Sequence, residues 1–139
     1  MGGAFSSAGG VSARNIARWN GSAWSALGSG ITGNVLNLAV RGGELYAAGV
    51  FSAAGVSANN IACWDGTNWR ALGSGIEDGG GRALAFLGNH LIVGGNFITT
   101  GGVATYNIAQ WNDGRWFALN HGLNDAVRAI ATGGTNICV

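Results

Sequence analysis

The sequence contains no lysine and no proline, and charged residues make up only 9% of its 139 positions. All the basic side chains are arginines, and the formal net charge is +1. Neither a basic stripe for a nucleic-acid backbone nor an acidic tail is present, so nucleic acid is not an expected partner. Apolar runs such as "LIV" after His90 are far too short to cross a bilayer, so we expect no membrane association.

The sequence also lacks the patterns of a signal peptide, a disulfide framework and a metal site. The N-terminal residues lack the charged, hydrophobic and small-residue succession of a signal peptide. Cys63 and Cys138 occupy different positions of the repeat described below, which argues against a disulfide and favours two small buried hydrophobic side chains. A metal site needs three or four convergent ligands, whereas His90 and His121 lie in separate repeats and no CxxC is present. We therefore expect neither a metal nor another cofactor.

The motifs of common enzyme classes are also missing. There is no G-x-S-x-G, no P-loop and no H-E-x-x-H. The "GSG" at residues 28–30 and 73–75 recurs with the repeat, so we interpret it as structural and not as a phosphate loop. The sequence predicts a protein that is not an enzyme, with an activity built across repeats as the one alternative that motifs do not reveal.

Glycine, by contrast, is abundant, with 27 residues, and the chain is an internal repeat. One phrase occurs three times: "NIARWNGSAWSALGSGI" from residue 15, "NIACWDGTNWRALGSGI" from residue 60 and "NIAQWNDGRWFALNHGL" from residue 107. Phe5, Phe51 and Phe97 are 46 residues apart. Without Met1 the chain has 138 residues, three times 46, so Met1 looks like an added start. Residues 1–139 form one domain of three repeats.

Each repeat divides into four short segments with the features of strands. In the first repeat they read "VLNLAV", "ELYAAGVF", "NIARW" and "WSALGSG". The glycine-containing "RGGE" and "NGSA" are hairpin turns, "SSAGGVSAR" is a longer loop, and "ITGN" connects repeats. Four antiparallel strands in 40–50 residues are typical of a β-propeller blade. The sequence predicts an all-β fold of three four-stranded blades, with residues 35–40, 83–88 and 127–132 as the innermost strands.

The repeat also carries a family resemblance. The run "GGxFxxAGGxxAxNIAxWxGxxWxxLGxGxxGxVxxLAVxxGxLYxGG" resembles the Kelch-like propeller repeats of bacterial secreted proteins and of the fungal cortical cell-polarity marker family. The second repeat departs from it, with "AAG" at residues 47–49 in place of a Gly-Gly pair. The resemblance covers the whole chain and implies a non-catalytic binding or scaffolding module from an extracellular or cell-surface parent protein.

Two sets of residues recur in every repeat. An asparagine precedes each "IA", and we expect its side chain to bond nearby backbone at a strand entry and not to contact a ligand. Two tryptophans per repeat, five residues apart, favour packing between blades, with stacking on sugars as the alternative. These residues are Asn15, Asn60 and Asn107, and Trp19, Trp24, Trp64, Trp69, Trp111 and Trp116.

A binding site is expected where the repeats differ. The connections "ITGN", "IEDGGG" and "LNDA" are unalike, and two arginines open segments that we assign to innermost strands. These side chains are candidates to line one mouth of a central channel, and solvated loops are the alternative. The "ED" pair lacks the D-x-D-x-D-G spacing of a calcium loop. The candidates are Glu77, Asp78, Arg82, His121, Asn124, Asp125 and Arg128.

The two ends of the chain are parts of one phrase. Joining "TNICV" to "GGAF" gives "ICVGGAF", which parallels "LYAAGVF" and "LIVGGNF" inside the chain. Three blades cannot close a ring, and propellers have about 4–8 blades. We therefore expect two chains to join head to tail as a six-bladed homodimer, with a nine-bladed trimer as the alternative.

The function that these features favour is a non-catalytic propeller scaffold or interaction module. The chain would be a fragment of a larger propeller, or an engineered piece of one, that assembles with itself. The alternative is a lectin-like, carbohydrate-binding propeller with one shallow site per repeat.

Overall fold

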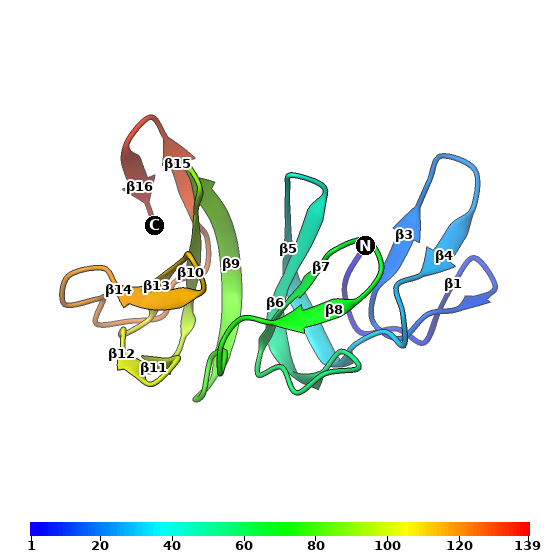
Figure 1. Ribbon diagram of the computed structural model, residues 1–139, viewed down its shortest axis with the longest axis horizontal. Coiled ribbons are helices and arrows are strands. Elements are labelled where there is room, and N and C mark those ends of the chain that lie inside the picture. Colours follow the sequence, from blue (N-terminus) through cyan, green and yellow to red (C-terminus); the bar gives the residue numbers. More distant parts are fainter.

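The computed structural model describes residues 1–139, except for the side chain of Ala53. All of its regular structure is β, arranged as antiparallel sheets and hairpins that lie side by side in a row (Figure 1). The expectation of an all-β fold is confirmed. In the described part of the chain there is no helix that could cross a membrane.

Two complete four-stranded sheets occupy the middle of the row. In the first sheet the strands follow chain order, each antiparallel to the next. Its first turn is the expected one, because Gly42 and Gly43 both have the positive φ that a tight two-residue hairpin needs. The strands are β5 (Thr32–Arg41), β6 (Glu44–Ala53), β7 (Ile61–Trp64) and β8 (Trp69–Ala71).

The second sheet repeats this arrangement. Its pairing register matches that of the first sheet: Leu91 lies opposite Trp111 on the neighbouring strand, as Leu45 lies opposite Trp64. Its strands are β9 (Gly80–Leu87), β10 (His90–Asn96), β13 (Ile108–Asn112) and β14 (Arg115–Ala118). Both first strands begin about three residues earlier than expected, so the segments assigned to connections, "ITGN" among them, partly belong to β5 and β9.

The third set of strands is divided between the ends of the row. The N-terminal hairpin, β3 (Ala17–Trp19) and β4 (Trp24–Ala26), lies at one end, and the C-terminal hairpin, β15 (Ala131–Gly133) and β16 (Asn136–Cys138), lies at the other (Figure 1). The expectation of three four-stranded sheets within one chain is therefore wrong. Each end of the row has a two-stranded hairpin in place of a four-stranded sheet.

The strand expected at residues 127–132 is also shorter than predicted. Only residues 131–133 pair, because their partner β16 has three residues. In the second sheet the corresponding partner strand, β10, continues as far as Asn96. The continuation of β16 would be residues 2–5, which lie at the opposite end of the row. Val127 instead donates its backbone N–H to Gly95 of the second sheet, over 2.8 Å.

The long loops contain structure that the sequence did not predict. The segment "SSAGGVSAR" forms a small hairpin, β1 (Ser7–Ala8) with β2 (Val11–Ser12), and the third repeat forms its counterpart, β11 (Thr99–Thr100) with β12 (Val103–Ala104). Each hairpin places a glycine against a tryptophan ring, Gly9 on Trp24 and Gly101 on Trp116. The loops are thus packed onto the outer strands.

The core consists of layers between neighbours in the row. One cluster joins the first and second sheets through residues such as Ile61, Leu91 and Val93, which are at most 1% exposed. Another joins the N-terminal hairpin to the first sheet through residues such as Ile16 and Phe51. Because the first sheet packs against a neighbour on each face, its strands carry apolar residues on both sides, which accounts for their weak alternation.

Packing between neighbours also explains why the second repeat has "AAG" at residues 47–49 in place of a Gly-Gly pair. A Cβ on Gly2 would collide with Val35, and one on Gly94 with Val127. The corresponding residue of the second repeat is Ala48, and there the opposing valine is replaced by Gly81, whose own Cβ would lie 2.8 Å from that of Ala48. Small and large residues are thus exchanged across the contact, which keeps its volume nearly constant.

Candidate functional site

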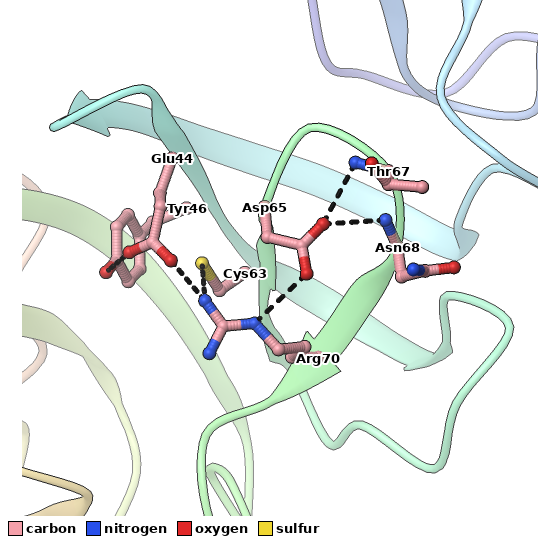
Figure 2. Close-up of polar contacts among 7 residues, drawn as sticks. All are labelled: Glu44, Tyr46, Cys63, Asp65, Thr67, Asn68 and Arg70. Atoms are coloured by element: carbon pink, nitrogen blue, oxygen red, sulfur yellow. Dashed lines mark hydrogen bonds and ion pairs between the residues drawn. The ribbon is translucent and has the colours of Figure 1, made fainter.

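One polar cluster is unique to the first sheet. Arg70 on β8 forms ion pairs with Glu44 on β6 and, over 3.5 Å, with Asp65 after β7 (Figure 2). The Tyr46 hydroxyl donates to the Glu44 carboxylate over 2.7 Å. Cys63 lies under the guanidinium, with its Sγ 3.9 Å from an Arg70 nitrogen. The cluster therefore ties three strands of one sheet together.

The ionisation of these groups follows from their surroundings. Backbone N–H groups of Asn68 and Thr67 donate to the Asp65 carboxylate over 2.8 and 2.9 Å and lower its pKa, and the Arg70 charge adds to this effect. Burial, and then the Glu44 charge, raise the pKa of the Cys63 thiol to about 11. Burial, followed by the hydrogen bond to Glu44, raises the pKa of Tyr46.

This arrangement is suited to stability more than to chemistry. A thiol with a pKa near 11 is protonated at neutral pH, and the thiolate is the form that reacts or binds metals. The guanidinium is already neutralised by two carboxylates. The positions equivalent to Arg70 in the other repeats are Ser25 and Phe117, so the cluster belongs to one repeat alone. Sequence reasoning missed it, because Glu44 and Arg70 are 26 residues apart and meet only through strand register.

Glu77 and Asp78, expected at a channel mouth, bind the backbone of the following loop. The Asp78 carboxylate accepts the N–H groups of Ile98 and Thr99 over 2.7 and 2.9 Å. The Glu77 carboxylate accepts the N–H of Gly102 over 3.0 Å and the Ser74 hydroxyl over 2.6 Å. Both acidic side chains therefore hold the β11–β12 hairpin in place.

The other candidates for the channel mouth are exposed. Arg82 lies on β9, and Arg128 follows the loop that carries Asn124 and Asp125. The Asp125 carboxylate accepts the N–H of Ala126 over 2.6 Å. His121 lies in the turn after β14. Among the residues described, no hydrogen bond or ion pair joins any two of the seven candidates.

The repeated asparagines bind backbone in the same way three times. Asn60 accepts the N–H of Phe51 at its Oδ1 over 2.9 Å and donates from Nδ2 to the carbonyl of Ile76 over 2.8 Å. Asn15 and Asn107 make the equivalent bonds. All three have a φ between 60° and 68°, a left-handed conformation that asparagine tolerates. Each asparagine thus joins the second strand of one sheet to the start of the next connection.

The repeated tryptophans join neighbouring units. Trp69 is 5% exposed and donates its indole N–H to the carbonyl of Leu27 over 3.1 Å, and Trp116 donates in the same way to Leu72 over 2.9 Å. The first tryptophan of each pair leans against the second, with ring centroids 5.1–5.4 Å apart. Trp19, at the end of the row, is 50% exposed.

Two equivalent shallow pockets lie beside the tryptophan pairs. One, of about 370 Å³, is lined by Gly28, Ser29 and Gly55 together with Trp64 and Trp69. The other, of about 290 Å³, is lined by the counterparts of all five residues in the next repeat: Gly73, Ser74, Gly101, Trp111 and Trp116. A shallow pocket that repeats with the fold is therefore present on the surface.

A third cleft lies between the N-terminal hairpin and the first sheet. It measures about 440 Å³ and is mostly apolar. One wall is formed by Ala17 and Trp19 of β3 together with Met1, which pairs with Ala17, and the other is the face of β5, with Leu38 and Val40. Val40 is 69% exposed. The cleft lies where the inner two strands of a four-stranded sheet would continue the N-terminal hairpin.

Both cysteines are free thiols, and their surroundings differ. Cys63 is buried, as expected, whereas Cys138 is exposed at the end of β16, so the expectation of two buried cysteines is wrong for Cys138. In the described part of the chain β16 pairs only with β15, so its other edge is not covered by a further strand. In the described part of the chain, no group of three or more His, Cys, Asp or Glu side chains is placed to hold a metal ion.

Comparison of the chain with protein-family models, with curated proteins and with solved structures gives no match.

Proposed function

We propose that the chain is a non-catalytic, Kelch-like β-propeller module that completes its ring by joining head to tail with a second chain. One observation carries the proposal: each end of the chain has a two-stranded hairpin, and the two hairpins correspond in the repeat to different halves of the complete four-stranded sheets. The N-terminal hairpin is the outer half, and the C-terminal hairpin is the inner half.

The N-terminal residues support this proposal because they already lie as part of a second strand. Gly2 pairs with Ile16, as Gly94 of β10 pairs with Ile108. Gly3 donates its N–H to the carbonyl of Asn15 over 3.0 Å, the distance at which Gly95 donates to its own asparagine. Residues 2–5 thus continue a strand whose first half, β16, lies at the other end of the chain.

The 440 Å³ cleft fits the missing half. A C-terminal hairpin from a second chain would place β16 beside β3 and β15 against the face that carries Leu38 and Val40. This docking covers the edge of β3, which within the chain pairs only with Met1 and otherwise invites pairing with other chains. It also buries Trp19 against Ile137, in the way that Leu91 and Trp111 face each other.

The number of chains follows from ring closure. A head-to-tail contact is heterologous and ends in a closed ring only when the rotation between units closes. Two chains contribute six blades, which lies within the usual range of about 4–8. The nine blades of a trimer lie outside it.

A disulfide trap tests the proposal. The register of β6 with β7 places Tyr46 opposite Cys63, so in a joined sheet Cys138 of one chain lies opposite Arg18 of the other. The next pair along, Met1 with Ala17, exchanges both backbone hydrogen bonds. The Arg18 pair is therefore the close, non-hydrogen-bonded kind, with Cα atoms about 4.5 Å apart, a distance that a disulfide bridges.

The trap uses Arg18→Cys in a chain that begins at Gly2, oxidised mildly and separated without reductant. We expect a covalent product of two chains that is circular, with two disulfides, and does not extend into a ladder. The matched control, Ser22→Cys, places a thiol in the exposed β3–β4 turn out of reach of Cys138 and should give no such product. Absence of cross-linking in the Arg18→Cys chain, or an open ladder, would contradict ring closure by two chains.

The repeated tryptophan pockets favour a second candidate function, a lectin-like binder of carbohydrate. Aromatic rings beside small polar residues suit the apolar face and hydroxyls of a sugar. Trp64 and Trp111 remain partly exposed at the two pockets. In a joined ring, Trp19 and Trp24 of one chain would meet Asn120 and His121 of the other at a third, equivalent position.

A glycan array followed by a tryptophan-fluorescence titration tests this second candidate. Saturable sugar binding whose number of sites falls in Trp64→Ala but is unchanged in Phe117→Ala, a substitution of an exposed aromatic residue outside the pockets, would support it. No saturable binding across the array would contradict it and leave the scaffold function.

A further inference from the structure

The two tryptophan pockets share one aromatic frame. In the pocket of about 290 Å³, the rings of Trp111 and Trp116 have centroids 5.1 Å apart and planes inclined at 58°. In the pocket of about 370 Å³, the corresponding values for Trp64 and Trp69 are 5.4 Å and 57°. Both pockets therefore offer a ligand the same pair of apolar surfaces, and a difference in what they bind comes from the residues around the rings.

The frame is held in place from behind. The indole N–H of Trp116 donates to the carbonyl of Leu72 over 2.9 Å. A Cβ on Gly101 would lie 2.3 Å from the Trp116 ring, so the β11–β12 hairpin packs directly against that ring. A wall that is already ordered before a ligand arrives lowers the entropic cost of binding.

The rims of the two pockets differ in charge. The residue before the second tryptophan lines the pocket in both cases, and it is Asn68 in one and Arg115 in the other. The described residues that line the pocket with Asn68 are all uncharged. Among those that line the other pocket, Arg115 is the only charged residue. One aromatic frame is thus combined with a neutral rim and with a cationic rim.

The charge of Arg115 is available to a ligand. Its side chain is exposed and forms no ion pair with a described residue. The Asp113 carboxylate, in the same turn, accepts the side-chain amide of the preceding residue over 3.1 Å. The Glu77 carboxylate accepts a hydroxyl and a backbone N–H of the pocket wall, over 2.6 and 3.0 Å. Neither acid lines the pocket, and a guanidinium presents N–H groups in a fork that matches a carboxylate or a sulfate.

We infer that the pocket of Trp111 and Trp116 binds a sugar unit that carries a negative charge, on a carboxylate or a sulfate group. The inference rests on the proposed carbohydrate-binding function and requires no contact between chains. The sugar ring stacks on the partly exposed Trp111, and its anionic group accepts N–H groups of Arg115. At the equivalent pocket the side chains of Thr67 and Asn68 offer neutral donors and acceptors, which suit the hydroxyl groups of an uncharged sugar.

Three saccharides test the inference: an oligogalacturonide, the same oligosaccharide with its carboxylates methyl-esterified, and a sulfated galactose oligosaccharide. Isothermal titration calorimetry on the full chain gives the number of sites and the dissociation constant for each. The comparison is Arg115→Asn, which gives this pocket the residue of its counterpart. Circular dichroism checks the fold of each chain.

We expect one tight site per chain for the oligogalacturonide, with a dissociation constant about tenfold lower than that of the ester, because one charge-assisted contact is added. In Arg115→Asn this tenfold preference should disappear. Binding of the ester should be unchanged, because it needs the aromatic frame and not the charge. The ester thus shows that the pocket itself is intact in the variant.

Transfer of the charge to the other pocket is the matched test. Asp65→Asn with Asn68→Arg reproduces the residues that the third repeat has at these positions. An asparagine can hold this turn, since Asn20 accepts the N–H groups of Ser22 and Ala23 over 2.9 and 2.8 Å. We expect this double variant to have two tight sites per chain for the anionic sugar.

The outcomes separate this inference from carbohydrate binding itself. Equal affinities for the acid, the sulfated sugar and the ester would overturn the inference and leave carbohydrate binding standing. Saturable binding of none of the three would overturn both. A preference for an anionic sugar that survives Arg115→Asn, or the lack of a second tight site in the double variant, would also contradict the inference. Arg115-dependent binding of either anionic sugar supports it, and the tighter of the two identifies the anionic group.

Discussion

The indole N–H of Trp69 donates to the backbone carbonyl of Leu27, which lies 42 residues earlier in the neighbouring unit. The next unit repeats the bond between Trp116 and Leu72. Trp24 is the equivalent tryptophan of the remaining repeat. The leucine that corresponds to its acceptor is Leu119, which lies toward the opposite end of the row. In the proposed assembly, Trp24 of one chain would make the corresponding bond to Leu119 of the other.

Replacing this tryptophan should weaken association. In Trp24→Phe the ring remains, but the N–H that would reach Leu119 of the second chain is lost. A neutral hydrogen bond contributes about 1 kcal/mol, so each junction should weaken by about fivefold. The dissociation constant of the Gly2 chain, measured by sedimentation, checks the prediction.

The matched control is Trp69→Phe, which removes the same bond inside one chain. It should lower the free energy of unfolding and change the dissociation constant less than Trp24→Phe does. Equal effects of the two substitutions on association would contradict a role of Trp24 at the junction.

The Cys63 thiol makes stability depend on pH. Its pKa is raised from 9.0 to about 11 in the folded chain, so the folded state favours the protonated thiol. The stabilisation is fully present below pH 9 and is lost as the pH rises to about 11. The raised pKa corresponds to about 2 to 3 kcal/mol across this range.

Urea unfolding at about pH 8 and about pH 10.5, on either side of the unfolded-state pKa, tests this dependence. The wild-type chain should lose more of its unfolding free energy between the two pH values than Cys63→Ala, which has no thiol to ionise. Tyr46 is present in both chains, and burial, the largest cause of its raised pKa, does not depend on Cys63, so most of its own titration cancels in the comparison. Identical losses would show that Cys63 is not the group responsible.

The two backbone hydrogen bonds made by the Asn60 side chain should contribute several times more to the free energy of unfolding than an ordinary surface contact. Asn60→Ala leaves the N–H of Phe51 and the carbonyl of Ile76 without their partner and places alanine at a φ of 61°. We expect a loss of about 2–4 kcal/mol in unfolding free energy. Asn59→Ala, at the exposed neighbouring position, should cost less than about 1 kcal/mol. Similar losses at both positions, in chemical denaturation, would contradict a special role for Asn60.

The sequence predicted the elements that depend on local pattern. The 46-residue repeat, the turns at Gly42 and Gly43 and the four strands per repeat follow from residue type and spacing, and two complete sheets contain them. The sequence did not predict the β11–β12 hairpin, since its two-residue strands are too short to show alternation. It placed a strand at residues 127–132 because the repeat does so, but a strand needs a partner, and half of that partner lies at the other end of the chain.

The candidate sites also divide into contacts that the local sequence pattern predicts and contacts that depend on the three-dimensional structure. Bonds that recur with the repeat, such as those of Asn60 and Trp69, could be expected from their identical placement. The Glu44, Cys63 and Arg70 cluster could not, because it occurs once and depends on which residues face each other across strands. Met1 was set aside because it falls outside the repeat count, and only the backbone geometry shows that it pairs with Ala17.

Native mass spectrometry of the chain that begins at Gly2, at low micromolar concentration, tests the central claim most directly. We predict a single folded species with twice the 14.0 kDa mass of one chain, lacking only the two methionines, and no larger series. A mass of three chains would replace the six-bladed ring by a nine-bladed one. A stable, folded species with the mass of a single chain would contradict the account.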